Sequence, residues 1–432
     1  MSRPASQLLV ERALALVPLG DEFLPLSDAL IGASHTDREK LWARSGTYST
    51  VGKRVLDADR LSALVPAVVI RAQERMERLF ALVIDAVRLQ GEGDAAGAAR
   101  ALVRAGEVEE GERRLEQAQQ IYTLALEVSR DLRDKDPEIL ALRRLGRSSR
   151  AAGRLDEAWE WYQRSHRLSV AQGDDTGQAV ACQGLGNVCD DRGERPEARA
   201  WFERGLEIAR RLDDPSVEWP FYTNLSVLAM LEGKLPLAER LLDRARERIE
   251  ASGAEDPLLY WLNNRGLLLV ECGEALAAEE VFREALARGP GPDWEVTLRV
   301  NLGGALVPQD RLLEAQDEAR RAEEIAILNR FVPDLVDVYL LLGSVARAQR
   351  DEEGFVFYEQ ALRVCRERGL PRKTEAAILH DYGVLHARCN RPSEARAYLD
   401  AAGEIYRALG FAPELARLAA DLGEVGAGPP ES

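Results

Sequence analysis

Apolar residues recur at spacings of three and four along most of the chain, and short breaks containing glycine or proline separate the apolar stretches. This spacing places the apolar side chains on one face of a helix, so it predicts amphipathic α-helices. Residues 137–150 and 156–165 form two such stretches around the break at 151–155. The pattern therefore predicts pairs of short helices joined by tight turns.

The helix pairs repeat along the chain. A small landmark residue returns every forty residues, and the period resumes after one step of thirty-seven. The eight landmarks are Gly106, Gly146, Gly186, Ser226, Gly266, Gly303, Gly343 and Gly383. Each unit also holds a second small residue that is followed four positions later by a usually larger one, such as Tyr162 after Ala158. A fixed period of this length predicts an array of stacked helix pairs without a single central core.

The landmarks Leu145-Gly146 with Ala158 and Tyr162, repeated as Leu185-Gly186 with Ala198 and Phe202, resemble those of the tetratricopeptide repeat family. The resemblance covers about residues 99–408. It implies an all-α fold, a right-handed α-solenoid of about eight helix-turn-helix repeats with a helical N-terminal cap and a C-terminal capping helix. The usual unit has about 34 residues. The longer units here resemble those of peptide-binding adaptors and of bacterial regulators with tetratricopeptide-like sensor regions.

The small residues have a packing role, because they let two antiparallel helices approach closely. We expect glycine on the first helix and alanine on the second to lie side by side, with the larger residue filling the space between neighbouring units. Trp161 and Trp201 share a repeat position that is apolar in almost every unit. We therefore interpret both indoles as part of the seam between units.

The two ends of the chain do not follow the period. Residues 1–92 predict a helical segment, either a cap or a small domain, and a helix-turn-helix over Thr47–Arg71 is an alternative interpretation. A glycine-rich join leads to the repeat array at 93–408. Residues 409–432 predict a capping helix, from Pro413 to Leu422, and a frayed tail.

The chain is acidic, with a net charge of −16. Such a field disfavours direct binding to nucleic acid and to anionic membranes. No apolar run reaches the roughly 18 residues that a membrane-spanning helix needs, and Glu11 and Arg12 precede any run of signal-peptide length. Five cysteines without a CxxC motif indicate reduced thiols. We expect a cytoplasmic protein with a protein or peptide partner, and a homodimer stays open.

Few residues have the spacing that catalysis or metal binding needs. The four histidines form no pair at the spacing of a zinc-protease helix. Cys182 and Cys189 have no second pair that would complete a tetrahedral site, and we interpret them as buried small apolar residues. The glycines belong to the repeat, so they form no phosphate-binding loop. The sequence predicts no catalytic residue, no metal site and no cofactor, and thus a protein that is not an enzyme.

The first helices line the concave side of such an array, so their free faces are the natural binding surface. The family resemblance places contacts three before, one after, and four to five after the landmark glycine. In the second unit these positions bring Arg143, Arg147 and Arg150 into one row, which could hold carboxylates or phosphorylated side chains. The alternative is that the arginines pair with Asp190 and Asp191 of the third unit.

Asparagine stands two residues before the landmark in three successive units, at Asn224, Asn264 and Asn301. Its amide offers a donor and an acceptor, which suit the backbone of an extended peptide of any sequence. The family resemblance favours that use, with Asn187 and Asn263 as neighbours on the same surface. The alternative is that these asparagines bond to the preceding unit and fix the superhelical turn.

Val227, Met230 and Leu267, with Leu231 and Val270 beside them, would give the same stretch apolar pockets for a partner. The leading hypothesis is a non-catalytic scaffold or adaptor whose groove, from about Arg143 to Asn301, binds a peptide or helix of a partner protein. The second hypothesis is a signal-responsive regulator, in which the array senses a peptide and the N-terminal segment acts on transcription or signalling. A third is a passive assembly subunit whose concave face is filled.

Overall fold

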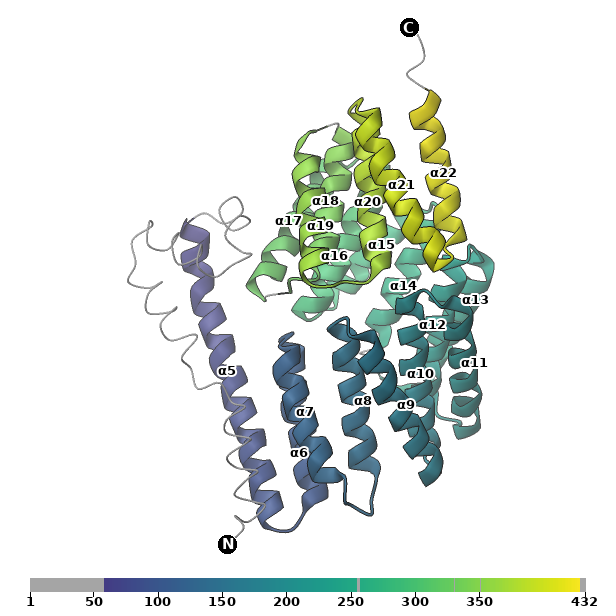
Figure 1. Ribbon diagram of the computed structural model, residues 1–432. Coiled ribbons are helices and arrows are strands. Elements are labelled where there is room, and N and C mark those ends of the chain that lie inside the picture. Colours follow the sequence, from purple (N-terminus) through teal and green to yellow (C-terminus); the bar gives the residue numbers. More distant parts are fainter. Residues whose placement is uncertain (1–57, 255–256, 330, 350, 428–432) are drawn as a thin grey trace. The chain divides into compact units, whose positions relative to one another are not determined.

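The computed structural model describes residues 58–254, 257–329, 331–349 and 351–427, and within these ranges the chain forms helices joined by short turns (Figure 1). Contacts divide the chain into two compact units, Met1–Ala152 with Ile327–Arg330, and Gly153–Ala326 with Phe331–Ser432. Residues 1–57, which include the first part of the Thr47–Arg71 segment, lie outside the described residues, as does the tail at 428–432.

The helices follow the predicted repeat. The first unit contains α5 (Ala58–Gly91), α6 (Ala95–Gly111), α7 (Leu115–Ser129) and α8 (Asp136–Ala151). The second contains α9 (Leu155–Gln172), α10 (Asp175–Arg192), α11 (Arg195–Leu212), α12 (Pro215–Leu231), α13 (Leu235–Ser252), α14 (Pro257–Glu271), α15 (Ala275–Ala287), α16 (Pro292–Leu306), η1 (Val307–Gln309), nearly all of α17 (Leu312–Leu328), α18 (Leu335–Gln349), α19 (Glu353–Glu367), α20 (Arg372–Arg388), α21 (Pro392–Leu409) and α22 (Ala412–Ala427). The eight landmarks fall on α6, α8, α10, α12, α14, α16, α18 and α20, so the all-α solenoid of about eight helix pairs is confirmed.

Buried charge holds the first unit together. Long helix α5 packs along α6, and Asp94 caps the start of α6 by accepting a hydrogen bond from the backbone of Gly97. Arg75 of α5 donates to both carboxylate oxygens of Glu109 at 3.0 Å, and Arg114 lies 2.7 Å from the same carboxylate. The Glu109 side chain is 1% exposed. The helical cap is therefore joined to the first repeat by a desolvated ionic cluster.

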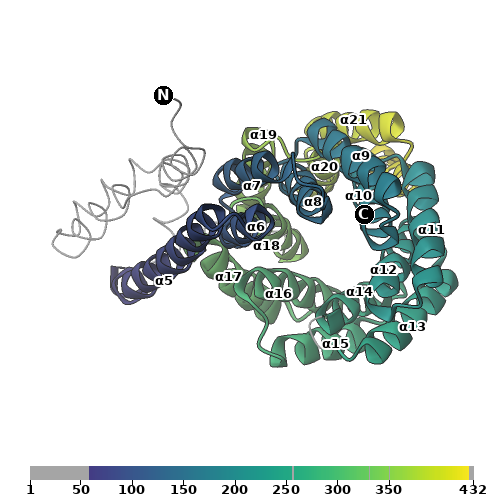
Figure 2. The ribbon, with the colours of Figure 1, turned by 90° about the horizontal axis from the view of Figure 1, so that it is seen from below.

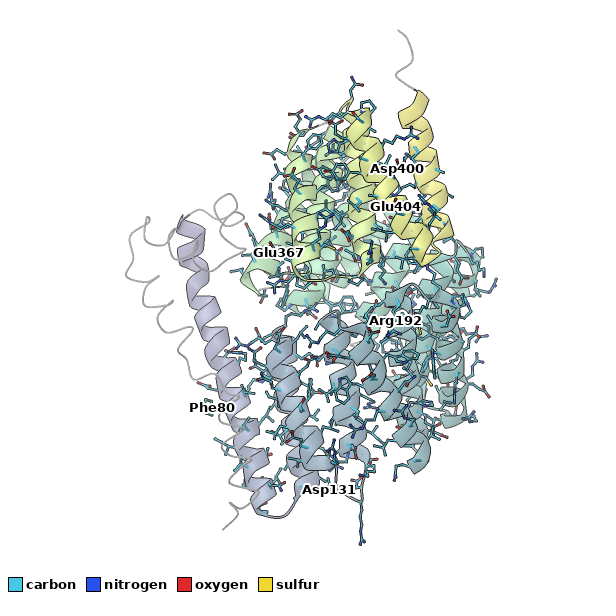
Figure 3. All side chains as sticks on the ribbon, in the orientation of Figure 1. Phe80, Asp131, Arg192, Glu367, Asp400 and Glu404 are labelled. Carbon is cyan, nitrogen blue, oxygen red and sulfur yellow. The ribbon has the colours of Figure 1, made fainter. Side chains whose placement is uncertain are left out.

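In the second unit the first helices of the repeats line the inner side, and the second helices lie outside them (Figure 2). Each first helix from α10 to α18 contacts the next first helix, and α20 contacts α22. The outer faces carry exposed acids such as Glu367, Asp400 and Glu404 (Figure 3). The predicted capping helix is α22, which packs on α21 and buries Leu418.

Landmark glycines make room for rings. A β-carbon on Gly106 would overlap Tyr122, and the same holds for Gly186 with Phe202, and for Gly266 with Phe282. Each of these rings thus packs against the glycine of its own helix pair. The expectation that it fills the space between neighbouring units holds for Tyr162, which lies against Gly184 of the next unit. Because the ring is flat and the glycine has no side chain, the two helix backbones come close.

Two further expectations from the sequence can be checked in the second unit. Gly153 and Gly193 both have positive φ, at 75° and 81°, as expected for residues at the break between helices. Trp201 packs with Trp159 against the buried cluster of Ala158, Tyr162, Leu185 and Val188, so its role in the seam is confirmed.

Candidate functional site

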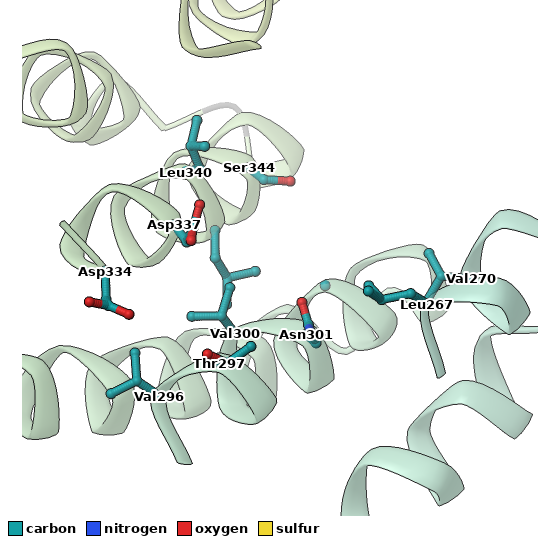
Figure 4. A pocket seen from close by; sticks show the side chains of 12 residues that line it. Leu267, Val270, Val296, Thr297, Val300, Asn301, Asp334, Asp337, Leu340 and Ser344 are labelled. Carbon is teal, nitrogen blue, oxygen red and sulfur yellow. The ribbon is translucent and has the colours of Figure 1, made fainter. Parts of the chain in front are cut away.

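A cavity of about 420 Å³ opens on the inner side of the second unit. Three successive first helices form its walls, α14, α16 and α18 (Figure 4). The lining residues are Leu267, Val270, Val296, Thr297, Val300, Asn301, Gly304, Asp334, Asp337, Leu340, Leu341 and Ser344. Most of this surface is apolar, and the polar groups sit at its edges, which is the usual composition of a ligand pocket.

The repeat register places these side chains. Helices α14, α16 and α18 bury the face that meets their partners, including Leu298, Leu302 and Val338. The opposite face of each helix is left toward the inner side, because residues three and four positions apart share a face. Gly304 adds space, since a β-carbon there would meet no atom within 4 Å. The pocket therefore results from the missing side chain of Gly304 between the aliphatic residues of three repeats.

Among the described residues that line the pocket, only Asp334 and Asp337 are charged. Asp337 is solvent-exposed and lines the pocket from α18 (Figure 4). Partial loss of hydration, followed by repulsion from Asp334, raises the pKa of Asp337 to about 6. Among the described residues, no Lys or Arg forms an ion pair with Asp337. The pocket thus presents a carboxylate for which the described residues supply no counter-charge.

The asparagines join successive first helices. The Nδ2 of Asn224 donates to Oδ1 of Asn187 at 3.3 Å, and Nδ2 of Asn301 donates to Oδ1 of Asn263 at 2.8 Å. Asn264 instead donates to the backbone carbonyl of Tyr260 in its own helix at 2.9 Å. Bonding to the preceding unit, the alternative drawn from the sequence, therefore occurs for Asn224 and Asn301. Binding of a peptide by these amides stays a prediction.

The structure brings three of the sequence-predicted residues, Leu267, Val270 and Asn301, into the pocket. Asn263 lies beneath its edge with 9% exposure. Val227 and Met230 are half-buried on α12 and do not line the pocket.

The predicted arginine row lies on α8 of the first unit. Arg143 and Arg150 are half-buried there, whereas Arg147 is exposed. The guanidinium of Arg147 donates to both oxygens of Glu110 on α6, at 2.8 and 2.7 Å. Glu110 also accepts from the hydroxyl of Tyr122 at 2.6 Å. In the second unit, Asp190 and Asp191 lie 3.5 and 3.2 Å from Lys373. The acid that pairs with Arg147 therefore belongs to the preceding repeat. The bidentate contact of Arg147 is not with Asp190 or Asp191 of the third repeat, which was the alternative drawn from the sequence.

Several lining residues were missed by sequence reasoning, although the register contained them. Val300 and Leu340 stand three before their landmark glycines, and Gly304 and Ser344 stand one after. These are the contact positions that the family resemblance gives, but they were not applied to the repeats of Gly303 and Gly343. Asp337, six before its landmark, belongs to the next helical turn and lies outside that rule.

Cys182, Cys189 and Cys365 are buried free thiols, and burial raises the pKa of Cys182 to about 11. The described residues contain no group of histidine, cysteine and acidic side chains that could hold a metal ion. None of the described helices is both long enough and apolar enough to span a membrane.

Comparison with known proteins agrees with this architecture. Residues 138–211 match the tetratricopeptide repeat family. No curated protein matches the sequence. Among solved structures, a Rap protein in complex with competence and sporulation factor is 12% identical with a TM-score of 0.62, and the match covers 80% of this chain and 99% of that one.

Two further structures have the same fold. The Rap conjugation gene regulator of plasmid pLS20, in complex with the Phr* peptide, is 13% identical with a TM-score of 0.54, covering 80% of this chain and 96% of that one. The apo quorum sensor NprR from B. thuringiensis is 15% identical with a TM-score of 0.52, covering 82% and 99%. At these identities the likeness concerns the fold. With the match at residues 138–211, it confirms the resemblance: the chain folds as a solenoid of tetratricopeptide-like repeats.

Proposed function

We propose that this protein is a non-catalytic, cytoplasmic interaction scaffold whose second unit binds an extended peptide segment of a partner protein. The observation that carries the proposal is the pocket between α14, α16 and α18, with aliphatic walls, the amide of Asn301 and the carboxylate of Asp337. Its volume, about 420 Å³, falls in the range of ordinary ligand sites, roughly 300–1,000 Å³. Aliphatic walls would accept an apolar side chain, and the edge groups would bond to the peptide backbone or to a polar neighbour.

The sequence-predicted residues enter this proposal in two groups. Leu267 and Asn301 belong to the pocket, with Asn263 supporting Asn301 from below. Asn187, Asn224, Val227, Met230 and Asn264 continue the same inner surface on α10, α12 and α14. The arginine row of α8 belongs to the other unit and stays a separate prediction.

Gly304 allows a sharp test, since the structure has room for a side chain there. Peptides would be selected from a random displayed library on the intact protein, and then measured by fluorescence anisotropy on two variants. Gly304→Trp fills the pocket and should weaken binding more than tenfold. The matched variant Gly304→Ala leaves the pocket open and should bind as the natural protein does. Circular dichroism would establish that both variants remain folded.

Two results would contradict the proposal. One is the failure of the natural protein to enrich any peptide family over repeated selections. The other is equal binding of the selected peptides to Gly304→Trp and Gly304→Ala, which would move the site away from the pocket.

A second candidate is the signal-responsive regulator. It is favoured by the fold shared with a Rap regulator whose structure contains the Phr* peptide and with a quorum sensor. In this case the selected peptide should change the binding of a second protein to the intact chain. A scaffold would hold its peptide without any such change, so a pull-down with and without peptide separates the two candidates.

A further inference from the structure

Three aromatic side chains form a ladder across neighbouring first helices. Trp219 of α12 lies with its ring centroid 5.8 Å from that of Tyr260 of α14. The Tyr260 ring lies 4.5 Å from that of Trp294 of α16, at an angle of 77°. Tyr260 is 46% exposed and is the one exposed aromatic residue in the part of the chain that the structure describes. A large exposed ring that contacts two others is a common feature of binding surfaces.

The ladder continues the pocket surface toward the N-terminal ends of the first helices. Trp294 stands three residues before Thr297, which lines the pocket. Tyr260 stands four before Asn264 and seven before Leu267, another lining residue. Because residues at these spacings share a helix face, rings and pocket belong to one surface. Four successive first helices, α12, α14, α16 and α18, then contribute to this surface, the first three by a ring and the last by Asp337.

Charge at this surface has one sign. Asp334 and Asp337 line the pocket without a basic residue among the other lining positions. Exposed Asp293 precedes Trp294 directly. Arg299 of α16 is already engaged, at 2.7 Å from Glu295 and 2.5 Å from Glu318. A ligand that approaches the ladder and the pocket therefore meets acidic side chains, among them Asp337, which has no ion pair with the described residues. A basic ligand is favoured electrostatically.

We propose that the ladder and Asp337 select an extended peptide that carries a proline or aromatic residue and, about five to six positions away, an arginine or lysine. This inference rests on the proposed function and names the chemistry of its ligand. A ring of the peptide stacks on Tyr260, and its basic side chain pairs with Asp337. Tyr260 on α14 and Asp337 on α18 are two first helices apart. Adjacent helices lie roughly 8–10 Å apart, so about five to six extended residues at roughly 3.3 Å each span the two steps.

The test is the sequence preference of selected peptides. A random displayed heptapeptide library would be selected on the intact protein and on variants at two exposed positions, Tyr260→Ala and Asp337→Asn. The natural protein should enrich a ring residue and a basic residue at the stated spacing. Tyr260→Ala should lose the ring preference and bind a selected peptide about tenfold more weakly, which is about 1.4 kcal/mol. Asp337→Asn should lose only the basic preference.

Controls and a charge exchange complete the design. Leu276→Ala, at a 68% exposed position on outer helix α15, should leave both preferences unchanged. Asp337→Arg should change the preference from basic to acidic residues. If selected peptides are blocked by Gly304→Trp but show neither preference, the proposed function stands and this inference is wrong. If the natural protein enriches no peptide, both are wrong.

Discussion

Two acidic residues of the first unit are paired with arginines, whereas an acidic residue on the inner face of the second unit is not paired with one among the described residues. In the first, Glu109 is held by Arg75 and Arg114, and Glu110 is held by Arg147 and Tyr122. In the second, Asp337 faces a pocket that offers no basic partner. A charge that the neighbouring repeat neutralises contributes to the fold, whereas one without a partner is available to a ligand. The same repeat scaffold thus supplies an end that ion pairs stabilise and a surface that can bind a ligand.

The largest effect is expected where charge is most deeply buried. Glu109→Ala leaves two guanidinium groups, of Arg75 and Arg114, without their carboxylate, and breaking a buried pair in this way costs about 3–5 kcal/mol. The free energy of opening of α6, measured by hydrogen exchange, should fall by that order. Glu92→Ala removes an exposed partner of Arg88 and should change it by less than about 1 kcal/mol. Equal effects of the two substitutions would show that burial does not govern the ionic cluster.

The fold could be predicted from the sequence because its cause is local. Landmark glycines recur at a constant distance from the ring that covers them, as in Gly106 with Tyr122, so the period itself encodes the close approach of helices. The predicted helix pairs and the capping helix α22 follow from that pattern. The register would also have identified Val300, Leu340 and Ser344, had it been applied to every repeat.

The sequence could not predict whether each charged site residue is paired within the protein or is available to a ligand. Whether Arg147 is available depends on Glu110, which stands thirty-seven residues earlier on a different helix. The pairing needs the rotation of α6 relative to α8, and many acids in the sequence could have met that arginine. Whether Asp337 has a basic partner could not be predicted either, and it has none among the described residues. Sequence spacing specifies which face a residue occupies, but the partner across the interface depends on how the helices pack.

A basic residue placed in the pocket would give Asp337 an ion pair like those of Glu109 and Glu110 in the first unit. Thr297→Arg places a guanidinium on α16, across the pocket from Asp337. We expect it to lower the pKa of Asp337 from about 6 and to weaken binding of a basic peptide about tenfold. Titration of the aspartate carboxyl by NMR and fluorescence anisotropy would measure the two effects. Thr297→Gln, of similar length without charge, is the control, and an Asp337 pKa that is the same in both variants would refute the expected pairing.

Two glycines of the second unit should respond to alanine with opposite signs. At Gly266 a β-carbon overlaps Phe282, and such overpacking costs about 1–3 kcal/mol. At Gly304 it meets nothing, so the better helix propensity of alanine should stabilise the protein by about 0.5–1 kcal/mol. Thermal unfolding of both variants would measure the difference. A loss of stability in Gly304→Ala would mean that the pocket is more closely packed than described.

The smallest expected effect is the contribution of Asp337 to stability, which depends on pH. Its pKa rises from an ordinary value of 3.8 to about 6 in the folded protein. Between these values the folded state binds more protons than the unfolded state, so the contribution of Asp337 to stability is full below pH 3.8 and is lost as the pH rises through about 6. Asp337→Asn should therefore melt at a higher temperature than the natural protein at pH 7.5, and the gap should close toward pH 4. The exposure of the carboxyl keeps the gap small.

Asp293→Asn, at an exposed position on α16, corrects for the general loss of one acid. A gap of equal size at both pH values, or one with the opposite sign, would mean that Asp337 already has a counter-charge in the folded protein and is not available to a basic ligand.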